Sequence, residues 1–115
     1  MKLLKKEQII IKKSKFIGYC FMVDNISEVE KIMQEIRLEH KKARHIPYAY
    51  KIDNVIKKSD DKEPGGTAGN PILNIILLRN LNNVLIVVVR YFGGIKLGAG
   101  GLIRAYSEAA SNVTK

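Results

Sequence analysis

The segment from Arg90 to Tyr106, RYFGGIKLGAGGLIRAY, holds five glycines in seventeen residues and follows the apolar run VLIVVV. Glycine destabilises a strand or helix by roughly 0.5–1 kcal/mol relative to alanine, so this cluster indicates special dihedrals or the close approach of another molecule. Gly93 and Gly98 have the Walker A spacing, but the Lys and Ser/Thr that should follow are absent. A dinucleotide fingerprint starting at Gly98 lacks its third glycine, because Ile103 stands there. The segment therefore does not predict nucleotide hydrolysis by either scheme.

The order of a strand, a glycine loop and a helix start nevertheless presents unpaired N–H groups with partial positive charge, which favours anion binding. The chain has fifteen lysines and five arginines, yet Arg90 and Arg104 both flank this loop. A guanidinium binds phosphate or carboxylate with two hydrogen bonds where lysine cannot. The alternative is that the glycines only let the loop fold tightly against the sheet. The candidate anion- or RNA-binding residues are Arg90, Gly93, Gly94, Lys96, Gly98, Gly100, Gly101 and Arg104.

The densest acidic cluster of the chain lies in the loop sequence SDDKEPGGTAG. A salt bridge from Arg90 or Arg104 to these carboxylates is the alternative to ligand binding by the arginines. Magnesium prefers carboxylate oxygens, but the spacing matches no calcium loop, and we predict no metal site and no catalytic residue. The candidate partners of the glycine loop are Asp60, Asp61, Glu63 and Thr67.

The remaining reactive side chains have simpler interpretations. His40 and His45 are five residues apart with no third ligand to complete a zinc set. Cys20 lies in an apolar strand and is interpreted as a core residue rather than a nucleophile. Three tyrosines are candidates for stacking on bases, with half-buried packing as the alternative: Tyr48, Tyr50 and Tyr91.

The composition predicts one domain over residues 1–115 with a formal net charge of +9. Basicity favours nucleic acid or an anionic surface as a partner, although a solvated lysine-rich surface is the alternative. A single cysteine indicates a reducing compartment, so we expect a cytoplasmic protein. The run VLIVVV is far shorter than the roughly 20 residues that span a bilayer, so we expect no membrane insertion, and no cofactor is predicted.

Hydrophobic periodicity predicts an element order of β-β-α-β-α-β-α. Ser27 with Glu30 is the expected capping box of the first helix, and Asn70 before Pro71 is the expected cap of the second. The unbroken apolar run from Val84 marks the central strand of the sheet. The predicted strands cover 8–12, 15–23, 48–52 and 84–92, the helices cover 27–40, 70–78 and the segment after the glycines, and 55–69 is predicted to be a loop.

Four segments resemble the signature segments of the IMPACT N-terminal domain family, which includes bacterial YigZ-like proteins. They are SKFIGY from Ser14, A-x-H-x-x-Y-A-Y from Ala43, SDDKEPGGTAGNPIL and VLIVVVRYFGGIKLGAGGLIRAY. The resemblance implies an α+β fold like the second domain of ribosomal protein S-five, with a sheet of about four strands and helices on one face. Such folds often contain a left-handed β-α-β crossover. Bacterial members usually carry a second, ferredoxin-like domain, which is not expected within these 115 residues.

The resemblance also carries a functional expectation, because eukaryotic relatives act in translational control. It implies a non-enzymatic module that binds RNA, the ribosome or a translation-associated protein. The alternative is a small hydrolase or phosphometabolite-binding protein that uses the glycine loop and the SDDKEP carboxylates. That alternative requires a pocket that joins these two loops.

Overall fold

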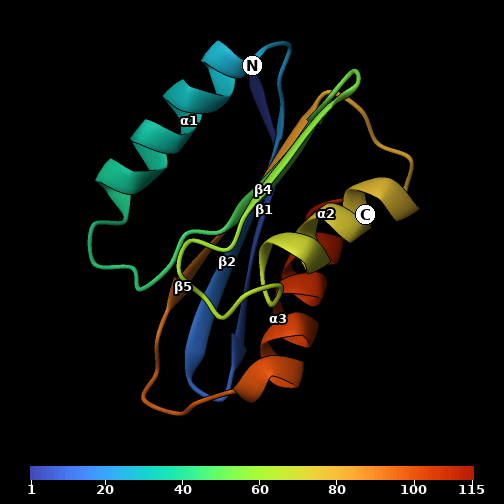
Figure 1. Cartoon of the computed structure of the whole chain (residues 1–115). Coiled ribbons are helices and arrows are strands. Elements are labelled where there is room, and N and C mark those ends of the chain that lie inside the picture. The colour runs from blue at the N-terminus through green and yellow to red at the C-terminus, as the bar shows by residue number, and fades with distance from the viewer.

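A computed structural model describes residues Met1–Lys115, and its backbone forms one five-stranded antiparallel sheet in the order β1-β2-β5-β3-β4 (Figure 1). The fold class is α+β, as expected. The elements are β1 (Lys2–Ile11), β2 (Ser14–Met22), α1 (Ile26–Glu39), β3 (Tyr48–Ile52), β4 (Val55–Ser59), α2 (Gly69–Leu78), β5 (Val84–Tyr91) and α3 (Gly98–Asn112).

Strand β5 is the central strand, as its continuous apolar run predicted. Successive side chains of a strand point to opposite faces, so β5 contributes to two cores. Val84, Ile86 and Val88 pack with α2 and α3, whereas the intervening residues from Leu85 to Val89 pack with α1. The same alternation places Arg90 on the face of Val88, toward α3, where its side chain is buried.

Helices cover both faces of the sheet, which corrects the expectation of helices on one face. The apolar stripe of α1 packs against one face, and the buried residues of α2 and α3 pack against the other (Figure 1). The apolar stripe of a helix indicates that one side of the helix is buried, but it does not indicate which face of the sheet the helix covers.

The sheet has five strands rather than about four, because Val55–Ser59 is the edge strand β4 and not part of a loop. Its sequence VIKKS is exposed over four of its five residues and pairs only with β3. An exposed edge strand buries no face, so it lacks the apolar alternation that identifies strands from sequence.

The two crossover connections have opposite hands. The pairing makes β2 parallel to β3 and β4 parallel to β5, and the two pairs run in opposite directions. The connections through α1 and α2 also cross the sheet in opposite directions and on opposite faces. The two connections therefore differ in strand direction, in direction across the sheet and in the face they cover. Because an odd number of such reversals inverts the hand, one of the two crossovers is left-handed, against the strong general preference for right-handed connections.

Both predicted helix caps are displaced. Asn25 Oδ1 accepts from Glu28 N–H at 2.9 Å and caps α1, two residues before the predicted Ser27. Helix α2 begins at Gly69, and Asp60 from the preceding loop satisfies its first N–H groups in place of Asn70. None of the helices combines the length and the apolar character needed to cross a membrane.

Candidate functional site

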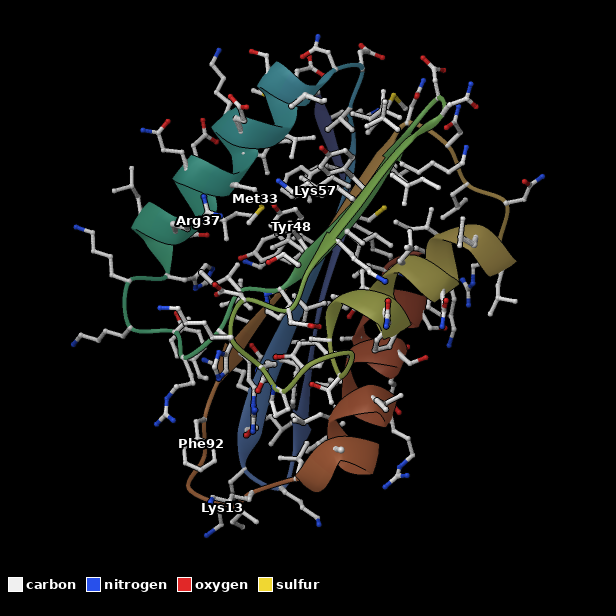
Figure 2. All side chains as sticks on the ribbon, in the orientation of Figure 1. Lys13, Met33, Arg37, Tyr48, Lys57 and Phe92 are labelled. Carbon is white, nitrogen blue, oxygen red and sulfur yellow. The ribbon has the colours of Figure 1, made fainter.

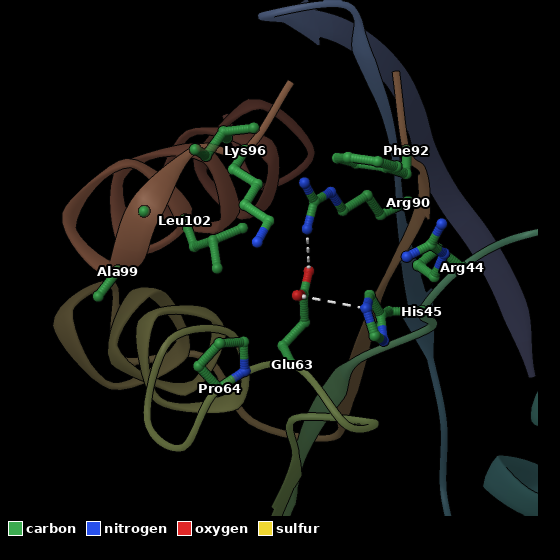
Figure 3. A pocket seen from close by; sticks show the side chains of 11 residues that line it. Arg44, His45, Glu63, Pro64, Arg90, Phe92, Lys96, Ala99 and Leu102 are labelled. Carbon is green, nitrogen blue, oxygen red and sulfur yellow. Dashed lines mark hydrogen bonds and ion pairs between the residues drawn. The ribbon is translucent and has the colours of Figure 1, made fainter. Parts of the chain in front are cut away.

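The acidic loop, residues 59–69 (SDDKEPGGTAG), and the glycine loop between β5 and α3 meet at one pocket (Figure 3). The pocket has a volume of about 380 Å³. This juxtaposition was expected from the two signature segments, and it provides the joint pocket that the hydrolase or phosphometabolite alternative requires. The lining residues are Arg44, His45, Glu63, Pro64, Arg90, Phe92, Lys96, Leu97, Gly98, Ala99 and Leu102.

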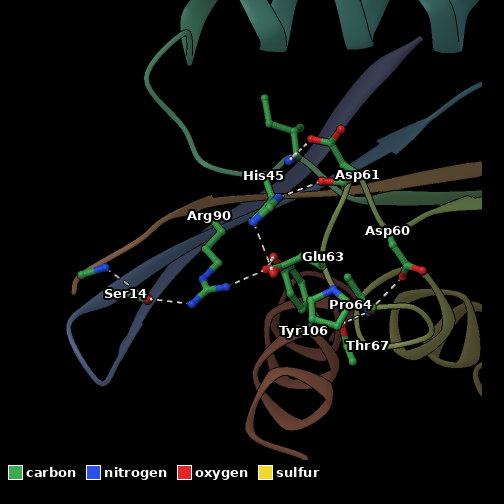
Figure 4. A network of polar contacts seen from close by, with 12 residues as sticks. Ser14, His45, Asp60, Asp61, Glu63, Pro64, Thr67, Arg90 and Tyr106 are labelled. Carbon is green, nitrogen blue, oxygen red and sulfur yellow. Dashed lines mark hydrogen bonds and ion pairs between the residues drawn. The ribbon is translucent and has the colours of Figure 1, made fainter. Parts of the chain in front are cut away.

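Glu63 is the buried centre of the wall of this pocket (Figure 4). Its side chain is 2% exposed, and its Oε2 accepts from Arg90 Nη1 at 2.8 Å and from the Tyr106 hydroxyl at 2.5 Å. His45 Nε2 lies 3.4 Å from the other oxygen, an ion pair when the imidazole is protonated. Burial, and then the hydrogen bond and charge of Glu63, raise the pKa of Tyr106, so this hydroxyl remains a donor. These partners compensate the buried carboxylate, as a buried charge requires.

Arg90 connects three parts of the chain. Besides its bond to Glu63, its Nη2 donates to Ser14 Oγ at 3.3 Å, and that oxygen also accepts from Gly93 N–H at 3.3 Å. The guanidinium carbon lies 5.5 Å from the ring centroid of Phe92. The salt bridge proposed as the alternative for the arginines is therefore present at Arg90. Its Nε is buried and has no hydrogen-bond partner.

The acidic residues before Glu63 are occupied by backbone groups. Asp60 accepts from the N–H groups of Gly66, Ala68 and Gly69. Partial burial alone would raise the pKa of Asp60, but these hydrogen bonds outweigh it and the pKa is lowered. The Asp61 carboxylate accepts from the N–H of residue 46 at 2.6 Å. These two carboxylates hold the loop in shape and do not line the pocket.

The backbone of the acidic loop also orients the pocket. His45 Nδ1 donates to the carbonyl oxygen of Asp61 at 2.8 Å, which leaves Nε2 facing Glu63. Thr67 Oγ1 donates to the carbonyl oxygen of Pro64 at 2.5 Å, so Thr67 is structural in this arrangement. No group of three or more His, Cys, Asp or Glu side chains lies together where it could hold a metal ion.

The glycine loop contributes to the pocket through its second half. Gly93 packs against the backbone of Lys13 so closely that a Cβ would overlap the Lys13 carbonyl group, which is the tight packing given as the alternative role of the glycines. Lys96, Gly98 and Ala99 line the pocket, and α3 starts at Gly98 with no side-chain cap and no acidic residue in its first turn.

Several predicted loop residues lie outside the pocket. Arg104 is exposed, makes no side-chain hydrogen bond or ion pair, and does not line the pocket with Arg90. The two arginines therefore do not share the pocket: Arg90 is buried in its wall, whereas Arg104 is exposed and its guanidinium lies near Gly100 in the first turn of α3. Gly94, Gly100 and Gly101 do not line the pocket either.

The tyrosines are engaged within the fold. Tyr48 and Tyr50 stack with ring centroids 6.4 Å apart on the side of the sheet that α1 covers, and Tyr50 is 4% exposed. Figure 2 shows Tyr48 next to Met33 of α1. The stacking interpretation is therefore corrected for Tyr50. The Tyr91 hydroxyl lies 2.6 Å from His40 Nδ1, and Lys15 Nζ lies 5.0 Å from its ring centroid.

Four polar residues of the site were not among the candidates: Ser14, Arg44, His45 and Tyr106. Ser14 and His45 lie in the matching segments SKFIGY and A-x-H-x-x-Y-A-Y, so these segments were the available signal. Arg44 was not identified because it reaches the pocket from a segment that lies far from the glycine loop in the sequence. Its guanidinium carbon lies 4.8 Å from the ring centroid of Phe92. In the sequence, Tyr106 is indistinguishable from an apolar core residue of the last helix, and only the structure shows that its hydroxyl donates to Glu63.

Comparisons with known proteins agree on one family. A sequence model of the Impact N-terminal domain matches residues 12–114. The chain is 46% identical over 109 residues to the IMPACT family member YvyE of Bacillus subtilis, covering 92% of this chain and 50% of that protein. The chain thus spans about half the length of this curated relative.

Two solved structures share the fold. The crystal structure of a hypothetical protein matches with a TM-score of 0.92 and 34% identity, covering 98% of this chain and 57% of that chain. The two-domain translational regulator Yih1 matches with a TM-score of 0.62 and 22% identity, covering 96% and 46%. At that identity, the second likeness concerns the fold alone.

Proposed function

This chain belongs to the Impact N-terminal domain family, and from that membership we propose that it is a non-enzymatic module that binds RNA, on or off the ribosome, in the control of translation. The translational context is supported by Yih1, a translational regulator with the same fold. RNA, rather than a translation-associated protein, is favoured by the chemistry of one end of the sheet.

The observation that carries this proposal is a basic rim, formed by three segments that contain no Asp or Glu: 12–15, 41–44 and 92–97. Arg44 and Lys96 line the pocket itself, whereas Lys41 and Lys42 lie in a neighbouring hollow beside Glu39. Gly93 packs against Lys13, Lys15 lies over the ring of Tyr91, and Arg44 lies over the ring of Phe92. Figure 2 places Lys13 and Phe92 at the same end of the molecule. The cations of the rim are Lys12, Lys13, Lys15, Lys41, Lys42, Arg44 and Lys96.

This composition fits a polyanion better than a protein surface. Lysine and arginine neutralise phosphates, whereas protein interfaces depend on a desolvated apolar core from which lysine is depleted. Tyr91 and Phe92 add half-buried aromatic rings between the cations. Basic grooves with interleaved aromatic rings are how proteins bind single-stranded RNA without strong sequence preference.

The test compares two triple variants with the same change in net charge. One is Lys13→Gln, Lys41→Gln, Lys42→Gln in the rim, and the control is Lys2→Gln, Lys31→Gln, Lys57→Gln, whose lysines are exposed elsewhere. Binding of fluorescent single-stranded RNA and of purified ribosomes is measured at several salt concentrations. We expect the rim variant to weaken binding and to reduce the log-log salt slope by about 2, at about 0.7 for each lost phosphate contact. Equal losses in both variants, or no association at low salt, would contradict the proposal.

The pocket itself favours a second candidate, a phosphometabolite-binding protein. A volume of about 380 Å³ falls within the range of small-molecule sites. Hydrolysis is less well supported, because Asp60 and Asp61 do not line the pocket and Glu63 is already paired with Arg90 and Tyr106. Assaying a generic phosphate ester for release of phosphate by the unaltered protein tests the hydrolase form.

A further inference from the structure

We infer that the pocket binds the terminal phosphate monoester of a nucleotide, either free or at the 5′ end of an RNA. The inference deepens the proposed function, and it rests on that function only for the RNA form of the ligand. It starts from the charges that line the pocket. Arg44 and Lys96 make no side-chain hydrogen bond or ion pair with any acid, whereas the one lining carboxylate, Glu63, is already held by Arg90 and Tyr106.

The first turn of α3 adds donors beside these cations. Leu97 occupies the cap position without a side-chain hydrogen bond, and the first turn has no acidic residue. Gly98 and Ala99 line the pocket, so the unpaired N–H groups of a 15-residue helix begin at its edge (Figure 3). Free N–H groups and the positive end of the helix dipole favour an anion at this position.

A buried donor in the pocket wall supports the same conclusion. The Arg90 side chain is 6% exposed, and its Nε has no partner although its other two nitrogens are engaged. Buried polar groups are normally satisfied, and here the fold supplies no acceptor for the Nε of a residue that lines the pocket, although its guanidinium also lies beside the rings of Phe16 and Phe92. Phosphate oxygens are acceptors of this kind.

The form of the ligand follows from charge and from the apolar part of the pocket. A monoester carries about −1.5 to −2 charges at neutral pH, which matches the two uncompensated cations better than the single charge of a diester within a chain. Phe92, Leu97 and Leu102 supply an apolar surface next to them. The Arg44 guanidinium over the Phe92 ring provides a flat platform on which a base stacks, so a nucleotide fits better than a free phosphate ion.

The decisive variant is Ala99→Asp. Ala99 is exposed in the first turn of α3 and lines the pocket, so the new carboxylate repels a phosphate there. An acidic residue near a helix N-terminus stabilises the helix, so the melting temperature should not fall and lost binding would not reflect unfolding. Gln34→Glu, at an exposed position of α1, is the matched control with the same change in net charge. Lys96→Gln is the second variant.

The experiment uses two ligand pairs, AMP against adenosine and a 5′-phosphorylated hexauridylate against its 5′-hydroxyl form, with titration calorimetry as the readout. We expect the phosphorylated member of at least one pair to bind about tenfold more tightly or better. Ala99→Asp and Lys96→Gln should remove that advantage, and Gln34→Glu should retain it.

The outcomes separate this inference from RNA binding by the rim. If both oligonucleotides bind equally and AMP binds no better than adenosine, the phosphate site is refuted while the RNA proposal stands. If AMP binds through its phosphate and neither oligonucleotide binds, the site holds a free nucleotide and the RNA proposal fails. A phosphate preference that survives unchanged in Ala99→Asp would also overturn the inference, because the phosphate would then lie elsewhere.

Discussion

Glu63 Oε2 and Arg90 Nη1 lie 2.8 Å apart, although the two residues are 27 positions apart in the chain and their side chains are only 2% and 6% exposed. The pair joins the acidic loop to the end of β5, and Tyr106 adds a bond from α3 to the same carboxylate oxygen. The wall of the pocket is therefore one polar network whose members stabilise the fold and shape the site together.

Removing the carboxylate charge should destabilise the protein strongly. In Glu63→Gln the buried Arg90 guanidinium loses its counterion, and we expect a loss of about 3 kcal/mol in the free energy of unfolding. Urea denaturation monitored by circular dichroism measures this. The control is Glu30→Gln, an exposed glutamate on α1, for which a change below about 0.5 kcal/mol is expected. Equal stabilities would mean that the pair contributes little to the fold.

Replacing each arginine by lysine should have unequal effects. Arg90→Lys retains the charge but cannot bond Glu63 and Ser14 together, so we expect a loss of about 2 kcal/mol in stability. Arg104→Lys lies on the exposed side of α3 and should change neither stability nor RNA binding measurably. Melting temperatures and RNA anisotropy of both variants check this. A loss of RNA binding in folded Arg104→Lys would return that residue to the site.

Asp60 should make the stability of the protein depend on pH in the acid range. Its folded-state pKa is lowered, so its contribution is fully present above the unfolded-state pKa of about 3.9 and is lost as the pH falls through the lower folded-state pKa. Asp60→Ala should cost about 1 kcal/mol at pH 7, as loss of a helix cap does. Urea denaturation of both proteins at neutral pH and near about pH 2 should show this difference shrink. If the difference in free energy of unfolding between the two proteins did not depend on pH, the effect of Asp60→Ala would come from lost packing and not from the lost carboxylate charge.

Two glycines of the loop should respond oppositely to alanine. A Cβ at Gly93 would overlap the Lys13 carbonyl group, so Gly93→Ala must displace the loop from the β1–β2 hairpin and should cost about 1–3 kcal/mol. A Cβ at Gly100 would meet only the Arg104 side chain, at 3.4 Å, and position 100 is helical. Gly100→Ala should therefore stabilise by about 0.5–1 kcal/mol. Thermal denaturation of both variants tests this, and destabilisation of both would point to a shared close contact.

The pattern of apolar residues was enough to locate the elements that bury a face. The strand predicted from Val84, the apolar stripe of α1 and the order of the other main elements all appear in the structure, because a periodicity of two or 3.6 residues is a local property of the chain. The glycine loop before the last helix could also be located from sequence, because its glycine content is likewise a local property of the chain. Its dihedral and packing demands are carried by the residue type itself.

The composition of the site depends on contacts between distant segments, and there local patterns are silent. Nothing adjacent to Asp60 in sequence indicates that it caps α2, and nothing near Arg104 indicates that it is exposed on α3 instead of lining the pocket. VIKKS becomes a strand only because β3 offers it an edge. Which side chains meet across the sheet is determined when both faces are packed at once. The pocket with Glu63, Arg90 and Arg44 in its wall arises at that stage. Hydrophobic periodicity does not connect the two loops that form it, and only their resemblance to family signature segments indicated that they meet.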